Sequence, residues 1–351
     1  MKRNFPALIA LGVSAVACGG GGGGSPTTPT SPASSTELLS STGLYSNAAS
    51  REVDARNRPY SPQYALWSDG GTKRRWVQLP AGARIDTSDM DRWVFPTGTK
   101  FWKEFSFQGR LVETRLIEKV GADASLESWR FKTYAWRQDQ SDAELASPDG
   151  VANVAPTSVG TAHDIPSVAN CRDCHQRGGD PVLGFGALQL SPDRDPLARE
   201  PVPAGAVNLD TLAAEGRITL APASPPSIVA ASGTGRAAMG YFHANCGNCH
   251  NPRGLAASSG MFLYHTSDVR RERDEPAYAT AVNQLTLRYT VPGTVLNASS
   301  FRIRGGSPEL SAVIARMSAR GNRDAMPPIG TEAEDVEAVG LISDWIRGLP
   351  R

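Results

Sequence analysis

Four of the five cysteines fall into two short motifs of the same form, C-x-x-C-H. The first motif contains Cys171, Cys174 and His175, and the second contains Cys246, Cys249 and His250. Two thiols three residues apart on a helical turn can reach the two vinyl groups of one haem, and the His that follows is then placed as the proximal iron ligand. The spacing therefore predicts two covalently attached c-type haems, one on each motif.

Three other chemistries also use C-x-x-C pairs. A thioredoxin-like redox pair calls neither for a His after the second Cys nor for a second copy of the motif. A single zinc site built from both pairs, or disulfides in an oxidising compartment, would also use these thiols. Because a His completes both copies, we favour haem, which leaves no cysteine for a structural disulfide.

The fifth cysteine, Cys18, follows a segment typical of exported proteins. Residues 1–3 are basic at positions 2 and 3, residues 7–17 are apolar and uncharged, and the small residues before Cys18 resemble a bacterial lipobox. A cleaved signal with an incidental cysteine is the alternative. We expect a signal peptide over 1–17, lipidation of Cys18, and a Gly/Ser/Thr/Pro tether over 18–36 that holds the protein at the cell envelope, on the periplasmic or outer-membrane face.

The bulk composition fits a globular protein. The chain has 351 residues, of which 40% are hydrophobic, and its formal net charge is +1. This length allows two or three domains. The near-neutral charge and the lack of a basic cluster with interleaved aromatics argue against nucleic acid as a partner.

Strand-like patterns dominate residues 37–165. Bulky and charged residues alternate over 129–134 and partly over 101–107, and Gln108-Gly109 predicts a hairpin turn. All tryptophans except Trp345 lie in this part of the chain. We predict an antiparallel β domain, either a sandwich or a strongly bent sheet, and an α+β fold class for the whole chain.

The rest of the chain falls into two segments with different sequence patterns. Residues 166–235 look irregular, and contain the first motif and a linker. From 236 to 351 we expect helices: one that runs into the second motif, one that starts at Ser307, and a last one that opens with a capping box at Thr331. Residues 263–300 look like an insertion between them.

Around the second motif, two features point to a known family. Tyr241 and Phe242 precede Cys246, and Met326 stands in a Met-Pro-Pro sequence just before the last predicted helix. This pattern resembles class I cytochrome c, which implies an all-α domain over 236–351 in which Met326 binds the iron on the side opposite His250. Should Met326 be a packing residue, the other candidates are Met317, Met261 and His265.

No motif marks the sixth ligand of the first haem. His163, His243, His265, Met239 and Met261 are all available, and for each one a plain structural role is the simpler reading. If the sixth coordination position of the first haem iron is open, a small molecule could bind and react there.

Several short sequences on both sides of the first motif resemble one further family. They are Leu44-Tyr45, Leu66-Trp67-Ser68-Asp69-Gly70, Trp76, residues 93–100, residues 112–116 and Val182-Leu183-Gly184-Phe185. Together they are similar to an uncharacterised family of bacterial di-haem c-type proteins. A weaker likeness, in Pro96-Thr97-Gly98-Thr99 and Gly109-Arg110, is to β-sheet haem enzymes that oxidise hydroxylamine or bind nitric oxide through a lysine-linked haem. No residue here identifies such a lysine.

These features predict an electron-transfer protein. We expect a di-haem c-type cytochrome that exchanges electrons with other envelope proteins. The alternatives are a haem enzyme for peroxide or nitrogen-oxide chemistry, with the first haem catalytic and the second a relay, or a β domain that binds a partner or glycan. The spacing assigns no general acid/base pair.

Overall fold

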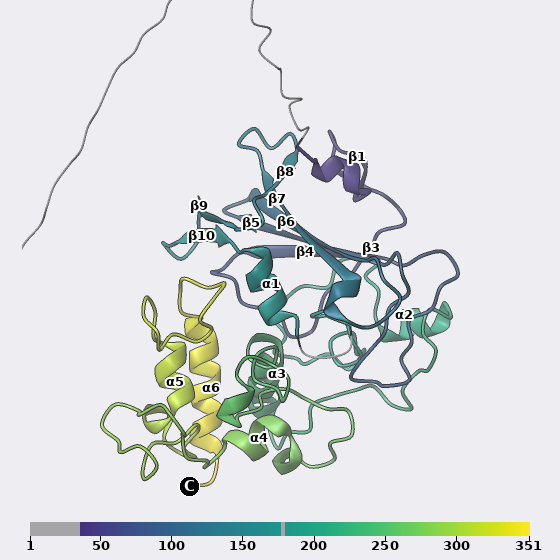
Figure 1. Cartoon of the computed structure of the whole chain (residues 1–351). Helices are drawn as coiled ribbons and strands as arrows, with labels where there is room; N and C mark the ends of the chain where they lie inside the picture. Colours follow the sequence, from purple (N-terminus) through teal and green to yellow (C-terminus); the bar gives the residue numbers. More distant parts are fainter. Residues whose placement is uncertain (1–35, 177–179) are drawn as a thin grey trace, which may run out of the picture. The chain divides into compact units, whose positions relative to one another are not determined.

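The computed structural model describes residues 36–176 and 180–351, so the signal segment, Cys18 and nearly all of the tether lie outside the described residues. The part from Thr36 to Arg351 forms one compact unit. Its main element is a six-stranded antiparallel sheet in the order β3-β4-β5-β6-β7-β8 (Figure 1). The strands are β3 (Arg58–Pro59), β4 (Thr72–Gln78), β5 (Lys100–Phe107), β6 (Arg110–Lys119), β7 (Trp129–Trp136) and β8 (Ala143–Leu145).

The predicted hairpin joins β5 and β6. Gln108 and Gly109 both have positive φ, 50° and 78°, which is the backbone conformation that a two-residue hairpin turn requires. Strand β7 covers the predicted strand at 129–134. The sequence prediction of an antiparallel sheet is therefore confirmed.

The sheet is a single layer of strands whose two faces are covered by irregular chain, so the predicted sandwich is not formed. On one face, Trp102, Leu116 and Tyr134 pack against Leu39 and Leu44, which belong to the segment of η1 (Leu39–Thr42) and the small β1–β2 hairpin. On the other face, apolar side chains of the strands pack against the segment that follows the first motif. These covering residues include Phe185, Leu190, Val207, Leu212 and Ile218, around α2 (Leu209–Ala214).

Two small sheets and one helix complete this part of the chain. Strands β1 (Tyr45–Asn47) and β2 (Glu52–Val53) form one two-stranded sheet, and β9 (Val151–Pro156) and β10 (Ala162–Ile165) form another. The second of these leads directly into α1 (Val168–Cys174), which carries the first motif. A short 3-10 turn lies here at η2 (Leu126–Ser128), and three more lie in the C-terminal part at η3 (Ala257–Ser259), η4 (Glu272–Asp274) and η5 (Pro308–Leu310).

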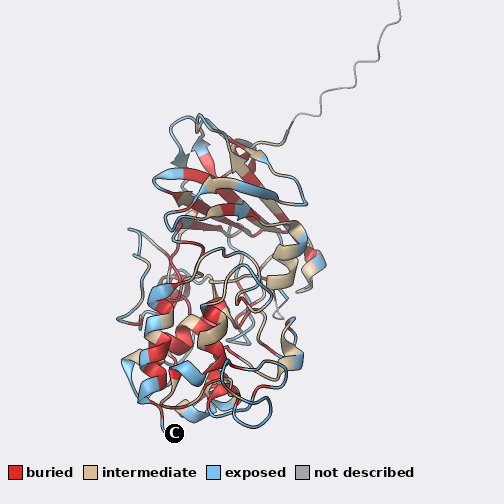
Figure 2. Cartoon of the chain, turned by 90° about the vertical axis from the view of Figure 1, so that its left-hand side faces the viewer, coloured by how far each residue is buried: buried red, intermediate tan, exposed pale blue. Residues whose placement is uncertain are grey.

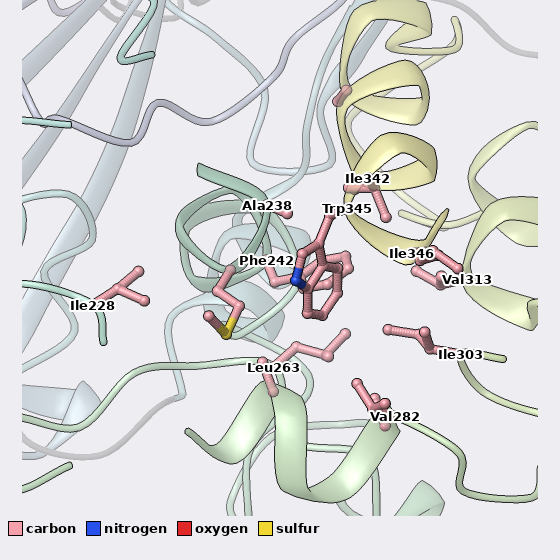
Figure 3. Close-up of a cluster of buried hydrophobic side chains, with 14 of the residues drawn as sticks. Ile228, Ala238, Phe242, Leu263, Val282, Ile303, Val313, Ile342, Trp345 and Ile346 are labelled. Carbon is pink, nitrogen blue, oxygen red and sulfur yellow. The ribbon is translucent and has the colours of Figure 1, made fainter. Parts of the chain in front are cut away.

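The C-terminal part has its own core, built mainly between α3 (Gly233–Asn245) and α6 (Val336–Gly348). Two shorter helices, α4 (Pro276–Ala281) and α5 (Ala312–Met317), lie between them in the chain. Phe242 of α3 meets Trp345 of α6 edge to face, with 6.0 Å between ring centroids (Figure 3). Figure 2 shows buried residues along the strands and again along α3 and α6, which matches the separate hydrophobic clusters of the two parts.

The prediction of an all-α class I cytochrome c-like domain over 236–351 is wrong. Only short helices occur there, and the chain between α4 and α5 is extended, with β-bridges that pair Val282 with Ile303 and Leu285 with Phe301. This segment contains several β-branched Thr and Val residues together with Pro292-Gly293, and it offers no apolar stripe at helical spacing. Val282, Val291 and Ile303 are buried, whereas Leu287 and Val295 are exposed. Phe301 bridges to Ser311, the residue before α5.

The expected start of the last helix also differs. Helix α6 begins at Val336, and the side chain of Asp335 caps it by accepting the N–H of Ala338. The capping box predicted at Thr331 does not form, and the side-chain oxygen of Thr331 has no hydrogen-bond partner among the described residues. The N–H groups of Glu332 and Ala333 donate instead to the carboxylate of Asp69, which comes from a distant part of the chain.

Candidate functional site

The first C-x-x-C-H motif lies on α1, the short helix between the β9–β10 hairpin and the irregular segment. Ser167 caps this helix through a reciprocal pair of hydrogen bonds with Asn170. Cys171 and Cys174 lie on the helix, and His175 follows at its C-terminal end, where its N–H donates to the carbonyls of Cys171 and Arg172. One helical turn therefore presents both thiols and the imidazole together.

The imidazole of His175 is held so that Nδ1 is hydrogen-bonded and Nε2 is left free. Its Nδ1 contacts the carbonyl oxygen of Pro181, so Nδ1 must carry the proton and donate it. The ring of Phe131 meets the imidazole edge to face at 5.2 Å between centroids. Burial lowers the pKa of His175 to about 4, so the ring is neutral at physiological pH. A neutral His with Nδ1–H bonded to a carbonyl presents its Nε2 lone pair, which is the usual arrangement of a metal-ligating His.

The second motif follows α3 without a break. The N–H of Cys246 donates to Phe242, and the N–H groups of Cys249 and His250 donate back to Cys246, so the motif forms a compact turn. Gly247 is required here, because a Cβ at this position would lie 2.7 Å from the carbonyl oxygen of Leu263.

His250 repeats the arrangement of His175. Its Nδ1 donates to the carbonyl oxygen of Met261 across 3.1 Å, and burial lowers its pKa. The two motifs come from different elements and different surroundings, yet in both the Nε2 of the His carries the lone pair. The donor set of each motif, two thiols and a neutral imidazole with free Nε2, fits a c-type haem.

A cavity of about 760 Å³ lies between the sheet and the chain around α1, α3 and the loop before α6. Its volume is within the range of small-molecule and cofactor sites. Both motifs contribute to its wall, which includes Cys171, Cys174, His175 and Cys249. Cys246 and His250 do not line this cavity, so the second motif meets it only through Cys249.

The second cysteines of the two motifs lie close enough to interact. Their interaction raises the pKa of Cys174 and lowers the pKa of Cys249 to about 7. The fold therefore brings together two motifs that are 75 positions apart in the chain, counted from Cys174 to Cys249.

The geometry does not support the alternative uses of the cysteines, in disulfides or as ligands of a shared zinc ion. Cys171, Cys174, Cys246 and Cys249 are all free thiols. Across residues 36–176 and 180–351, no group of three or more Cys, His, Asp or Glu side chains converges in a way that could hold a metal ion, so the two pairs do not form a shared zinc site.

The loop that carries Met326 is tied to the second motif indirectly. The N–H of Met326 donates to the carbonyl of Arg316 across 3.0 Å, and Arg316 is close enough to His250 for its charge to contribute to the lowered pKa of that residue. Met326 is half-buried and does not line the cavity, whereas the residues that follow it, from Pro327 to Glu332, do.

A strap formed by residues 65–69 connects the second motif to this loop. Asn245, the residue before Cys246, accepts the N–H of Trp67 at 2.7 Å and donates to the carbonyl of Ala65. Asp69, which is almost fully buried, accepts the N–H groups of Glu332 and Ala333. The Leu-Trp-Ser-Asp-Gly sequence thus fixes the end of α3 and the loop before α6 in one network, a role that its residues alone did not reveal.

The candidates for a sixth ligand have different surroundings. His163, His243 and His265 all line the cavity. His163 contacts Glu113 at 2.9 Å and His265 contacts Glu275 at 3.0 Å, so each of these two imidazoles has a carboxylate partner. Met239 and Met317 are buried in the core of the C-terminal part, and Met261 packs against that core.

A buried ion pair stabilises the segment that orients His175. Asp180 accepts hydrogen bonds from Lys119 Nζ, Trp129 Nε1 and the N–H of Phe95, and the side chains of both Asp180 and Lys119 are fully buried. Asp180 directly precedes Pro181, whose carbonyl receives the His175 proton. Sequence reasoning missed this anchor, because only the fold brings positions 119 and 180 together.

Comparison with known proteins adds no relative: no family model, no curated protein and no solved structure matches this chain. In the described part of the chain, no helix has the length and apolar character needed to cross a membrane.

Proposed function

We propose that this protein is a di-haem c-type cytochrome that carries electrons in the bacterial cell envelope. One haem would be attached to Cys171 and Cys174 with His175 as proximal ligand, and the other to Cys246 and Cys249 with His250. The observation that carries the proposal is the matching orientation of the two imidazoles, each of which follows a pair of thiols and bonds to a backbone carbonyl through Nδ1. The interaction between Cys174 and Cys249 supports it by placing the two motifs near each other.

The nearness of the two motifs favours electron transfer because of what each thiol would become. A c-type haem is bound through thioether bonds at the edge of its ring, and iron bound in this way supplies one-electron redox chemistry. Thiols that lie near each other before attachment would place the two attachment edges close together, so electrons would have a short path between the haems. Pro181 and Met261 would hold the proximal imidazoles in place through their carbonyls.

For the second haem we propose Met326 as the sixth ligand. The support is local: Arg316 holds the backbone of Met326 and lies near His250. A thioether opposite a His saturates the iron and raises its reduction potential, which suits an electron carrier.

A second candidate is a haem enzyme for peroxide or nitrogen-oxide chemistry, with the first haem catalytic. The observation that favours it is the 760 Å³ cavity beside Cys171, Cys174 and His175. In that case the second haem would act as a relay. Low-spin spectra for both haems would support the carrier, and one high-spin or water-ligated haem would support the enzyme.

We also propose that the protein is exported and held at the envelope by a lipid on Cys18, where its redox partners would be other envelope proteins. The residues that suggest this lie outside the described part of the chain, so the proposal rests on the sequence.

The test of the proposed function is a count of haems and a measure of their coupling. Protein produced with the c-type maturation system should retain haem on a denaturing gel and exceed the polypeptide mass by two haem masses. Its EPR spectrum should show magnetic interaction between the two ferric haems, because adjacent attachment sites bring them close. Bound zinc, or a single haem, would overturn the proposal.

A further inference from the structure

Three cations form a row across the sheet face that borders the cavity. Arg75 on β4, Lys103 on β5 and Arg115 on β6 stand directly opposite one another in the strand register. All three line the cavity. Like charges in directly opposed positions destabilise an antiparallel sheet, so the fold gains nothing from this row by itself.

The middle cation of the row differs from its two neighbours. Arg75 is paired with Glu200, with 3.0 Å between Nη2 and Oε1, and Arg115 is paired with Glu113, with 3.1 Å between Nε and Oε2. For Lys103, the described residues offer no acidic side chain within ion-pair distance. The row therefore leaves one positive charge without a counter-ion.

The surroundings of Lys103 make that charge costly. Its Nζ lies over the ring of Phe105, 4.8 Å from the centroid, and its exposed portion borders the cavity. Burial, together with the charges of Arg75 and Arg115, holds the pKa of Lys103 well below its usual value. Lys103 is half-buried, and its ammonium group has no acidic partner among the described residues, so its position beside a cavity indicates a ligand with negative charge.

The row is also close to the first motif. The charges of Lys103 and Arg115 act on His175 and contribute to its lowered pKa, after the larger effect of burial. Arg115 in turn interacts electrostatically with Cys171 and Cys174. An anionic group bound at Lys103 would therefore belong to, or lie next to, whatever those two cysteines hold.

We propose that the row binds an anionic oxygen group in the cavity, and that this group is a propionate of the haem on Cys171 and Cys174. The inference rests on the proposed function. Lys and Arg form strong charge-assisted hydrogen bonds with carboxylates, and the spare charge of Lys103 would then have a partner. A small oxyanion from solution offers the same chemistry and is the other possible source.

The test compares two lysines of the same strand. Lys103→Gln removes the proposed contact, and Lys100→Gln removes the same charge from the opposite face of β5, where Lys100 lies 3.6 Å from Glu118. In the holoprotein, loss of a cation near one iron favours its ferric state, so Lys103→Gln should lower the reduction potential of one haem and leave the other unchanged. The propionate bending band in the resonance Raman spectrum should shift as well, and Lys103→Arg should restore both signals. Lys100→Gln should leave both haems unchanged.

A second measurement distinguishes the two sources. Titration with nitrite and with inorganic phosphate should change the absorption spectrum in a saturable way only if the row takes a free oxyanion, and Lys103→Gln should then weaken binding by about tenfold or more, with potentials unchanged in the absence of the anion.

If Lys103→Gln matches Lys100→Gln in potentials, Raman bands and titrations, the row binds no anion and the inference is overturned. The haem count separates this failure from that of the proposed function. Two haems with no effect at Lys103 would overturn only the inference, whereas fewer than two haems would overturn the proposed function.

Discussion

The buried pair of Lys119 and Asp180 allows a stability prediction that also tests the site. Asp180→Asn keeps the shape of the side chain, but it replaces one carboxylate oxygen with an amide that can only donate. In the native protein the two carboxylate oxygens accept from Lys119 Nζ at 2.7 and 2.6 Å, from Trp129 at 2.8 Å and from Phe95 at 2.5 Å. The substitution would leave the ammonium of Lys119 buried without a counter-charge.

Breaking a buried ion pair by removing one partner costs about 3–5 kcal/mol. For a compact unit of this size, the unfolding entropy converts this loss into a fall in Tm of about 5–8 °C. Thermal unfolding followed by circular dichroism would measure it. Because Asp180 precedes the carbonyl that orients His175, the absorption and EPR spectra of one haem should change, and those of the other should not.

Two controls make this prediction refutable. Removing both charges, in Lys119→Met with Asp180→Asn, should recover at least half of the lost Tm, since no unpaired charge is left buried. Glu127→Gln removes a carboxylate that pairs with Arg172 at the protein surface, and it should cost no more than about 1 kcal/mol. If Asp180→Asn unfolds at the wild-type temperature, or the double variant is less stable than the single one, the pair does not anchor this segment.

Substitutions at three further positions test other parts of the reasoning. Met326→Ala should abolish the weak sulfur-to-iron band of the oxidised spectrum and move one haem towards high spin without loss of haem; unchanged spectra and potentials would make Met326 a packing residue and direct attention to Met317, Met261 or His265. Asp69→Ala should cost about 2–3 kcal/mol, because two N–H groups lose a charged acceptor, and should perturb the second haem only. Asp69→Asn, which keeps an acceptor and tolerates the positive φ of 48°, should cost less in the same urea titration. Cys18→Ala should release the protein from membranes or block its processing, and a lipid-modified mass in that variant would contradict the expected anchor.

Local sequence signals predicted the sheet and its central hairpin. The alternation along β5 and β7 and the Gln108-Gly109 turn are short-range features, and the structure contains the elements they indicate. The fold of the C-terminal part was predicted wrongly. The residues near Cys246 and Met326 resemble class I cytochrome c, and this local resemblance was extended to all of residues 236–351. The chain between α4 and α5 follows its own β-branched and turn-forming composition instead.

The candidate site was only partly predictable for a different reason. The thiols and imidazoles are recognisable because the attachment pattern is local in sequence. The groups that orient them are not: a backbone carbonyl at Pro181 has no side-chain signature, and the partners Lys119 and Asp180 are 61 positions apart. Lys103 alternates with Phe101 and Phe105 on one strand face, so the sequence did show a cation on an otherwise apolar face, but it could not show the cavity beside it.

The strap of residues 65–69 also bears on the order in which the molecule assembles. Asp69 bonds to N–H groups that come 263 and 264 positions later in the chain, near its C-terminus. Contacts of such long sequence separation form late, because the entropy of closing a large loop must be overcome first. A chain that emerges N-terminus first cannot complete this network until Ala333 is free, so the wall of the cavity formed by Pro327 to Glu332 closes last. Until then the four thiols of the two motifs belong to an unfinished site, and under the proposed function this leaves an interval in which both haems would be attached before the strap closes over them.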